Sequence, residues 1–137
     1  HLGQGNASAS TAPLKFTSGT NLTTPENGTF EYDGTHFYGT QSGASRYQIG
    51  LRLTGSATLD FPSTLAGTVS ELTITVTGAA DGDPVEVGVP NGSMPATGSY
   101  EADVSAANTV TVRYANNSLT LTQDPASGTF KVSLSKN

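Results

Sequence analysis

The sequence has no cysteine and only 12% charged residues among its 137 positions. Without cysteine there is no disulfide framework, no thiolate zinc site and no cysteine nucleophile, so stability must come from packing or from oligomerisation. Long apolar runs are also missing, and no charged segment followed by an apolar one opens the chain. We therefore predict neither a signal peptide nor insertion into a membrane.

Positive charge is scarce as well. Six Lys and Arg residues stand against eleven Asp and Glu residues, which gives a formal net charge of −5. Nucleic acids and anionic membrane surfaces are bound through clustered cations, so this balance excludes both as partners. Abundant Thr and Ser and 16 Gly residues, with 34% hydrophobic residues, suit many short strands joined by tight turns. A helical bundle is not expected.

The first half of the chain holds too little apolar surface for a core. Residues 1–12 are almost free of apolar side chains, so we expect a disordered tail or an expression scar, since the chain begins with His1 rather than Met. Residues 13–50 carry aromatic side chains among many turn residues. Such a segment cannot fold independently, so it must pack on the next domain or on other copies of itself.

A β-hairpin is predicted within residues 13–50. Asp33 and Gly34 stand between two aromatic-rich runs, and Asp-Gly is the pair that a two-residue type I′ turn requires. This turn would place Phe30 opposite Phe37. Glu31 would then lie beside His36 on the opposite, solvent-exposed face.

Residues 51–137 show a strict alternation of apolar and polar side chains. This period of two is typical of strands with one buried face, and clusters of Gly, Pro, Asn and Asp separate the runs. About seven such strands must cover one another, which predicts an all-β fold: an antiparallel β-sandwich of two sheets preceded by the hairpin module. The alternating positions are Leu51, Leu53, Ala57, Leu59 and Phe61; Leu72, Ile74 and Val76; Val85, Val87 and Val89; Tyr100, Ala102 and Val104; Val110, Val112 and Tyr114; Leu119 and Leu121; Phe130, Val132 and Leu134.

Two groups of carboxylates were considered as sites. Asp81, Asp83 and Glu86 could supply oxygen ligands to calcium, but they lack the ligand spacing of an EF-hand, so acidic turn residues are the favoured interpretation. Glu101 and Asp103 alternate with apolar residues, which places them on the wet face of a strand rather than across a catalytic cleft.

The remaining motifs also favour a protein that is not an enzyme. His36 is the one internal histidine, so it cannot build a zinc site, and the chain has neither a nucleophile elbow nor a glycine-rich phosphate loop. We predict no catalytic residue, no metal and no cofactor. Tyr38, Tyr47 and Tyr114 are candidates for stacking on a sugar of a receptor, although a buried or interfacial aromatic is the commoner situation.

Two stretches resemble a known family. The first resembles a segment that recurs in tail-fibre proteins of tailed bacteriophages and prophages, and it reads PLKFTSG at residues 13–19 and LTTPENGTFEYDGT at residues 22–35, with Phe37, Tyr38 and Arg46 following. The second is similar to a small β-sandwich at the C-termini of phage structural and tail-fibre proteins, and it comprises residues 60–63, 73–79, 106–113 and 124–130.

The resemblance implies a virion structural protein, a homotrimer that attaches the particle to a bacterial cell-surface receptor, with a glycan as one candidate. Residues 13–50 would be a trimerisation or collar module, and residues 51–137 the tip. Phe16, Phe30, Tyr32 and Phe37 are then expected at the subunit interface. The alternative is a monomeric carbohydrate-binding or adhesion module, in which residues 13–50 pack on the sandwich.

Overall fold

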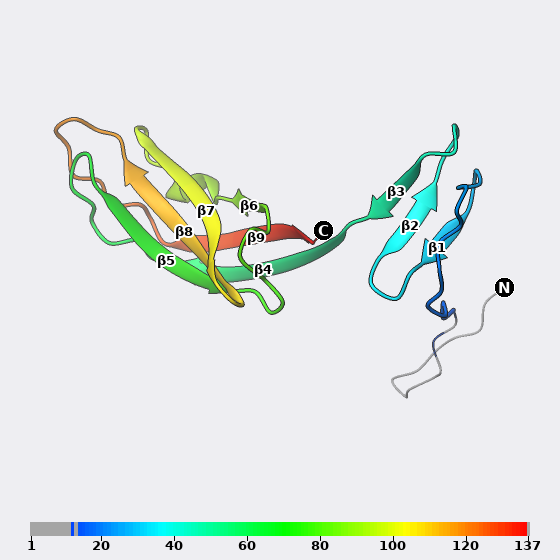
Figure 1. The fold of residues 1–137 in the computed structure, drawn as a ribbon. Helices are drawn as coiled ribbons and strands as arrows, with labels where there is room; N and C mark the ends of the chain where they lie inside the picture. Colours follow the sequence, from blue (N-terminus) through cyan, green and yellow to red (C-terminus); the bar gives the residue numbers. More distant parts are fainter. Residues whose placement is uncertain (1–11, 13, 137) are drawn as a thin grey trace. The chain divides into compact units, whose positions relative to one another are not determined.

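The computed structural model describes residue 12 and residues 14–136, and the tail predicted for residues 1–12 lies almost wholly outside them. The described chain is all-β apart from one turn of 3₁₀ helix, η1 (Asn91–Ser93), as predicted (Figure 1). The strands are β1 (Phe30–Tyr32), β2 (Phe37–Thr40), β3 (Arg46–Ile49), β4 (Leu51–Leu59), β5 (Val69–Thr75), β6 (Val85–Gly88), β7 (Gly98–Ala106), β8 (Thr109–Asn116) and β9 (Gly128–Lys136).

The chain divides into two compact units, one ending at Gly50 and the other beginning at Leu51. In the first unit, β1, β2 and β3 form an antiparallel sheet in that order. Strand β3 was not predicted from the sequence. Its apolar positions Tyr47 and Ile49 alternate with polar ones, but the run is too short for the period to be distinctive.

The predicted register of the hairpin is wrong. Tyr32 pairs with Phe37, and Glu31 pairs with Tyr38 instead of His36. The Asp33 carboxylate accepts hydrogen bonds from the backbone N–H groups of Thr35 and His36, both at 2.7 Å. This Asx-type turn holds four residues, and only Gly34 in it has a positive φ, at 100°, whereas a type I′ turn needs two such residues.

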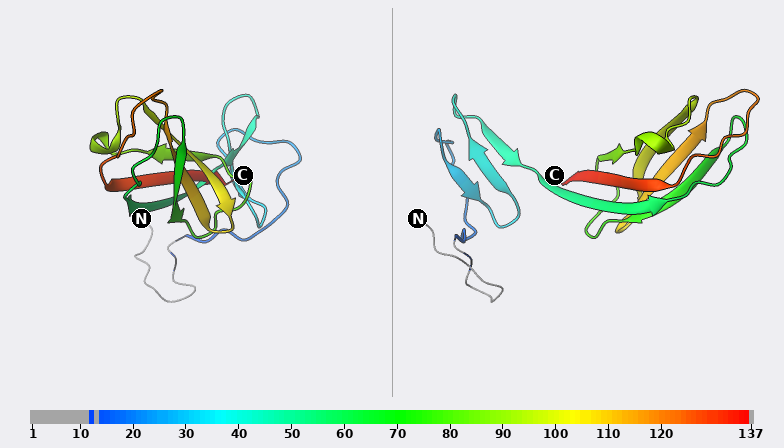
Figure 2. Two further views of the ribbon diagram at one scale, coloured as in Figure 1. Left: turned by 90° about the vertical axis from the view of Figure 1, so that its left-hand side faces the viewer. Right: turned by 180° about the vertical axis from the view of Figure 1, so that it is seen from behind.

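The second unit is the predicted sandwich of two antiparallel sheets. One sheet has the strand order β4-β9-β6 and the other β5-β8-β7. Figures 1 and 2 show the two layers, with β9 in red between β4 and β6. All pairings are antiparallel, and β4 and β9 stay in register over nine residue pairs from Leu51–Lys136 to Leu59–Gly128.

The core lies between the two central strands. Phe130, Val132 and Leu134 of β9 and Val110 and Val112 of β8 are at most 2% exposed. An aromatic cluster joins the layers, with ring centroids 5.1–6.1 Å apart, and comprises Phe61, Tyr100, Tyr114 and Phe130. Burial raises the pKa of Tyr100 to about 12, and the neighbouring Tyr114 adds to the shift.

The sandwich has six strands rather than about seven. Leu119 and Leu121 were predicted to form a strand, but they lie in the loop between β8 and β9 and are 95% and 65% exposed. Two alternating leucines satisfy the strand pattern, but neighbouring side chains bond the backbone of this segment into turns.

Candidate functional site

One face of the N-terminal sheet gathers the aromatic side chains of the unit. Phe30 and Tyr32 of β1 are two residues apart, so their side chains point to the same side of the sheet. In one row across the sheet, Phe30 of β1 pairs with Gly39 of β2, which pairs with Tyr47 of β3. In the next row, Tyr32 pairs with Phe37, which pairs with Ile49. We call this surface the aromatic face; it comprises Phe16, Phe30, Tyr32, Phe37, Gly39, Tyr47 and Ile49.

The four predicted interface residues come together on this face. Tyr32 and Phe37 stack with ring centroids 4.5 Å apart, and Phe30 lies 5.9 Å from Phe37. Phe16, from the segment before β1, lies 5.3 Å from Phe30 and 5.8 Å from Phe37. These spacings suit offset and edge-to-face aromatic packing. The side chains thus form one cluster, which comprises Phe16, Phe30, Tyr32 and Phe37.

The described residues of the unit leave the aromatic face partly exposed. Phe30, Tyr47 and Ile49 are 51%, 55% and 39% exposed, and no apolar side chain among residues 14–50 is buried. Gly39 lacks a side chain between Phe30 and Tyr47, which leaves a shallow hollow of about 320 Å³ along this row. The described part of the unit therefore has no buried apolar core, as its low apolar content predicted.

The opposite face carries an ion pair between Glu31 and Arg46 that was not predicted from the sequence. Arg46 Nε donates to Glu31 Oε2 at 2.9 Å, and Arg46 Nη2 also donates to the carbonyl oxygen of Leu22. The backbone N–H of Leu22 donates to Glu31 Oε1 at 2.6 Å. Glu31 and Arg46 thereby fasten the segment before β1 to the sheet. Their separation of 15 residues gives no periodic signal in the sequence.

The N-terminal sheet should lose stability in acid because two carboxylates support it. The backbone N–H of Leu22, aided by Arg46, holds the pKa of Glu31 below its ordinary value of 4.5. The N–H groups of His36 and Thr35 lower the pKa of Asp33 from 3.8. A lowered folded-state pKa stabilises the fold above the unfolded pKa, and this contribution is lost as the pH falls through the folded value.

We expect Glu31→Gln to weaken the sheet near neutral pH and to flatten its acid dependence between about pH 5 and 3. Amide hydrogen exchange and chemical shifts of residues 29–49 measure both effects. Glu26→Gln, at an exposed carboxylate of the same unit, is the matched control. An unchanged acid profile in Glu31→Gln would contradict the role given to this carboxylate.

The three tyrosines predicted to contact a receptor have different environments. Tyr114 is 0% exposed, so its prediction as a receptor contact is wrong, because its alternation with Val110 and Val112 marks the core face of β8. Tyr38 is partly buried, and its hydroxyl donates to Asp33 Oδ2 at 3.0 Å. Tyr47 is exposed, but it lies on the aromatic face.

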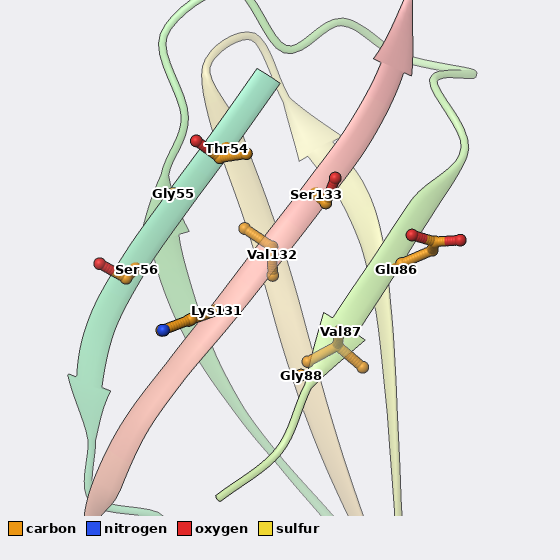
Figure 3. A pocket seen from close by; sticks show the side chains of 9 residues that line it. All are labelled: Thr54, Gly55, Ser56, Glu86, Val87, Gly88, Lys131, Val132 and Ser133. Carbon is orange, nitrogen blue, oxygen red and sulfur yellow. The ribbon is translucent and has the colours of Figure 1, made fainter. Parts of the chain in front are cut away.

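A hollow of about 600 Å³ lies over the β4-β9-β6 sheet (Figure 3). All its lining residues belong to these three strands, so it is on the outer side of the sandwich. Thr54, Ser133 and Glu86 form one cross-strand row, and Ser56, Lys131 and Gly88 form the next. The hydroxyl and ammonium groups could hydrogen-bond a polar ligand, but neither Ser56 nor Ser133 is hydrogen-bonded to Lys131 or Glu86, as a nucleophile paired with its base would be.

The carboxylates considered for calcium do not share a site. Asp83 accepts hydrogen bonds from Lys136 Nζ at 2.8 and 3.1 Å, and Glu86 pairs with Arg52 instead. The Lys136 ammonium and the N–H of Ala80 lower the pKa of Asp83. Within residue 12 and residues 14–136, no group of three or more His, Asp or Glu residues could hold a metal ion.

The remaining polar candidates are ordinary strand and turn residues. Asp103 pairs with Arg113, whose Nε also donates to Glu71 at 2.6 Å, while Glu101 is exposed on the same strand as Asp103. His36 lies edge-on to Tyr38, with ring centroids 6.2 Å apart. In the part of the chain that the structure describes, no helix is long and apolar enough to cross a membrane.

No protein-family model, curated protein or solved structure matches this chain. The resemblance to phage tail-fibre proteins therefore stays a prediction from the sequence.

Proposed function

We propose that this chain is a non-enzymatic structural segment of a bacteriophage or prophage tail fibre, which attaches the virion to the bacterial surface. Its copies associate as a homotrimer through the aromatic face, and the sandwich forms the host-facing tip. The observation that carries the proposal is the aromatic face, with aromatic rings gathered on one side of a sheet that buries no apolar side chain. Large apolar surfaces of this kind mark association sites.

In the proposed trimer, this face is covered by further copies of the chain. The sandwich has its own core, with Val110, Phe130 and Leu134 at 0% exposure. The eleven N-terminal residues HLGQGNASAST contain one large apolar side chain, Leu2. Further copies of the chain can supply matching aromatic surface. A trimer also presents three tips at once, so modest individual contacts combine into firm attachment.

The experiment that tests the proposal is the mass in solution, measured by light scattering after size exclusion. We expect about three times the chain mass of 14.0 kDa. Tyr47→Lys, which adds a charge to the aromatic face, should yield single chains, because an unpaired buried charge is costly. Gln48→Lys is the matched control, since Gln48 is the next residue of β3 and points to the opposite face.

Two results would count against the trimer. A wild-type mass of one chain would exclude self-association and favour the monomeric carbohydrate-binding module, for which the hydroxyl-lined hollow of Figure 3 is the supporting observation. Equal dissociation in Tyr47→Lys and Gln48→Lys would show that charge alone disrupts assembly and that the aromatic face is not the contact. Binding on a glycan array, lost in Lys131→Ala, would identify the hollow as the functional site.

A further inference from the structure

Two loops at one end of the sandwich are joined into a single frame. Residues 60–68 connect β4 to β5, and residues 117–127 connect β8 to β9; the green and orange loops lie side by side in both views (Figures 1 and 2). Thr64 and Gln123 form a bridge in which the N–H of each donates to the carbonyl oxygen of the other, at 2.8 and 3.0 Å. We call these two loops the loop end.

Asn116, only 1% exposed, is the centre of this frame. Its Nδ2 donates to the carbonyl oxygens of Thr64 at 2.9 Å and Leu121 at 2.8 Å, one in each loop. Its Oδ1 accepts from the N–H of Ser118 at 3.0 Å. Its backbone is also hydrogen-bonded to the first loop: the Asn116 carbonyl accepts from the N–H of Gly67, and the Asn116 N–H donates to the carbonyl oxygen of Thr68. One buried amide therefore fixes both loops.

From this frame three leucines point into solvent. Leu119 is 95% exposed, and Leu65 and Leu121 are each 65% exposed. The backbone N–H of Leu121 donates to the buried Ser118 hydroxyl at 2.9 Å, so hydrogen bonds rather than leucine burial determine the local conformation. Apolar anchors on loops that are already ordered bind at a low entropic cost, because little conformational freedom remains to be lost.

The surroundings of the leucines narrow the class of partner. The two loops contain no Lys or Arg, and their charged residues are Asp60 and Asp124. Phosphate-rich surfaces need cations, so they are poor partners. Sugars are commonly held by exposed aromatic rings, whereas the one aromatic residue here, Phe61, is 2% exposed and belongs to the core.

We propose that the loop end docks a protein, whose apolar pocket receives Leu119 and Leu121 and whose rim is positively charged. The two carboxylates of the loops complement such a rim. The inference deepens the proposed function and rests on it for the location of the partner: on a tail fibre, this protein belongs to the bacterial surface.

The test uses the full chain and a library of random peptides displayed on filamentous phage. Selected peptides should carry a large apolar residue flanked by Lys or Arg. Leu119→Ser with Leu121→Ser should weaken their binding at least about tenfold, measured by fluorescence polarisation of the synthetic peptides. Leu51→Ser is the matched control, because Leu51 is 60% exposed and lies on β4. Serine at exposed positions leaves the fold intact.

Several outcomes would overturn the inference. An apolar docking site would be excluded if the selected peptides bind the leucine variant as tightly as the wild type, or if the selection yields no binder. Leucine-dependent binding to a glycan array or to phosphatidylglycerol vesicles would assign the surface to another class of ligand. A lower solution mass in the leucine variant would mean that a second copy covers it. The wild-type mass separates the two proposals, since a monomer that binds peptides through its leucines refutes only the trimer.

Discussion

Replacement of Tyr114 by alanine is expected to unfold the sandwich at moderate temperature. The Tyr114 ring is fully buried and lies 5.1 Å from Tyr100 and 6.1 Å from Phe61, and its hydroxyl donates to Gln123. Truncating a buried aromatic side chain costs about 3–5 kcal/mol through lost apolar contacts and the cavity left behind. Domains are stable by about 5–15 kcal/mol, so this loss is a large part of the total.

Thermal unfolding followed by far-ultraviolet circular dichroism measures the effect. For a unit of this size we expect a fall in Tm of roughly 12–40 °C. Val69→Ala is the control for truncating a side chain of the sandwich, because Val69 is 56% exposed and lies on β5. Tyr114→Phe should lower stability by only about 1 kcal/mol, since it removes one hydrogen bond. Equal melting of Tyr114→Ala and the wild type would contradict the described core.

The second large effect is expected for Asn116→Ala. The substitution leaves the carbonyl oxygens of Thr64 and Leu121 and the N–H of Ser118 without their side-chain partner. The Thr64 carbonyl keeps the N–H of Gln123, whereas the Leu121 carbonyl and the Ser118 N–H lose their partner; since an unsatisfied buried polar group costs about 1–3 kcal/mol, the loss should be a few kcal/mol. The backbone bonds between Thr64 and Gln123 remain, so the loops should loosen more than the sheets.

Asn117→Ala is the matched control, because this neighbouring asparagine is exposed and its side chain makes one hydrogen bond, to Ser99 Oγ at 3.0 Å. Hydrogen exchange should increase in residues 60–68 and 117–127 of Asn116→Ala and stay unchanged in Asn117→Ala. Binding of leucine-dependent peptides should weaken in Asn116→Ala, because the anchors are no longer held in place. Unchanged protection of both loops would show that Asn116 does not hold the frame.

The alternation of apolar residues predicted the sandwich correctly from the sequence. Phe130, Val132 and Leu134 of β9 and Leu72 and Ile74 of β5 all face the core, as their spacing requires. The pattern is reliable here because each strand has one buried and one wet face, and side chains alternate between them. The same rule marks Tyr114 as a core residue, because it alternates with Val110 and Val112. Its assignment to a receptor contact contradicted this alternation.

The candidate sites were predictable only in part. Phe16, Phe30, Tyr32 and Phe37 were grouped from their chemistry, and the structure brings their rings together. Tyr47, Ile49 and Gly39 join them only through the pairing of β2 with β3. The rows also depend on the register of β1 against β2, which the four-residue turn built by the Asp33 carboxylate shifts from that of a two-residue turn.

The fold class, the inward positions of the sandwich strands and the lack of core material in residues 13–50 were predictable from the sequence, because they follow from composition and from a period of two. The register of the N-terminal sheet, the pairing of Glu31 with Arg46, and the outward placement of Leu119 and Leu121 emerge only in the folded chain. These features depend on specific hydrogen bonds, which Asp33 makes within its turn, Glu31 makes to Leu22 and Arg46, and Asn116 makes to both loops. Local periodicity contains no information about such partners.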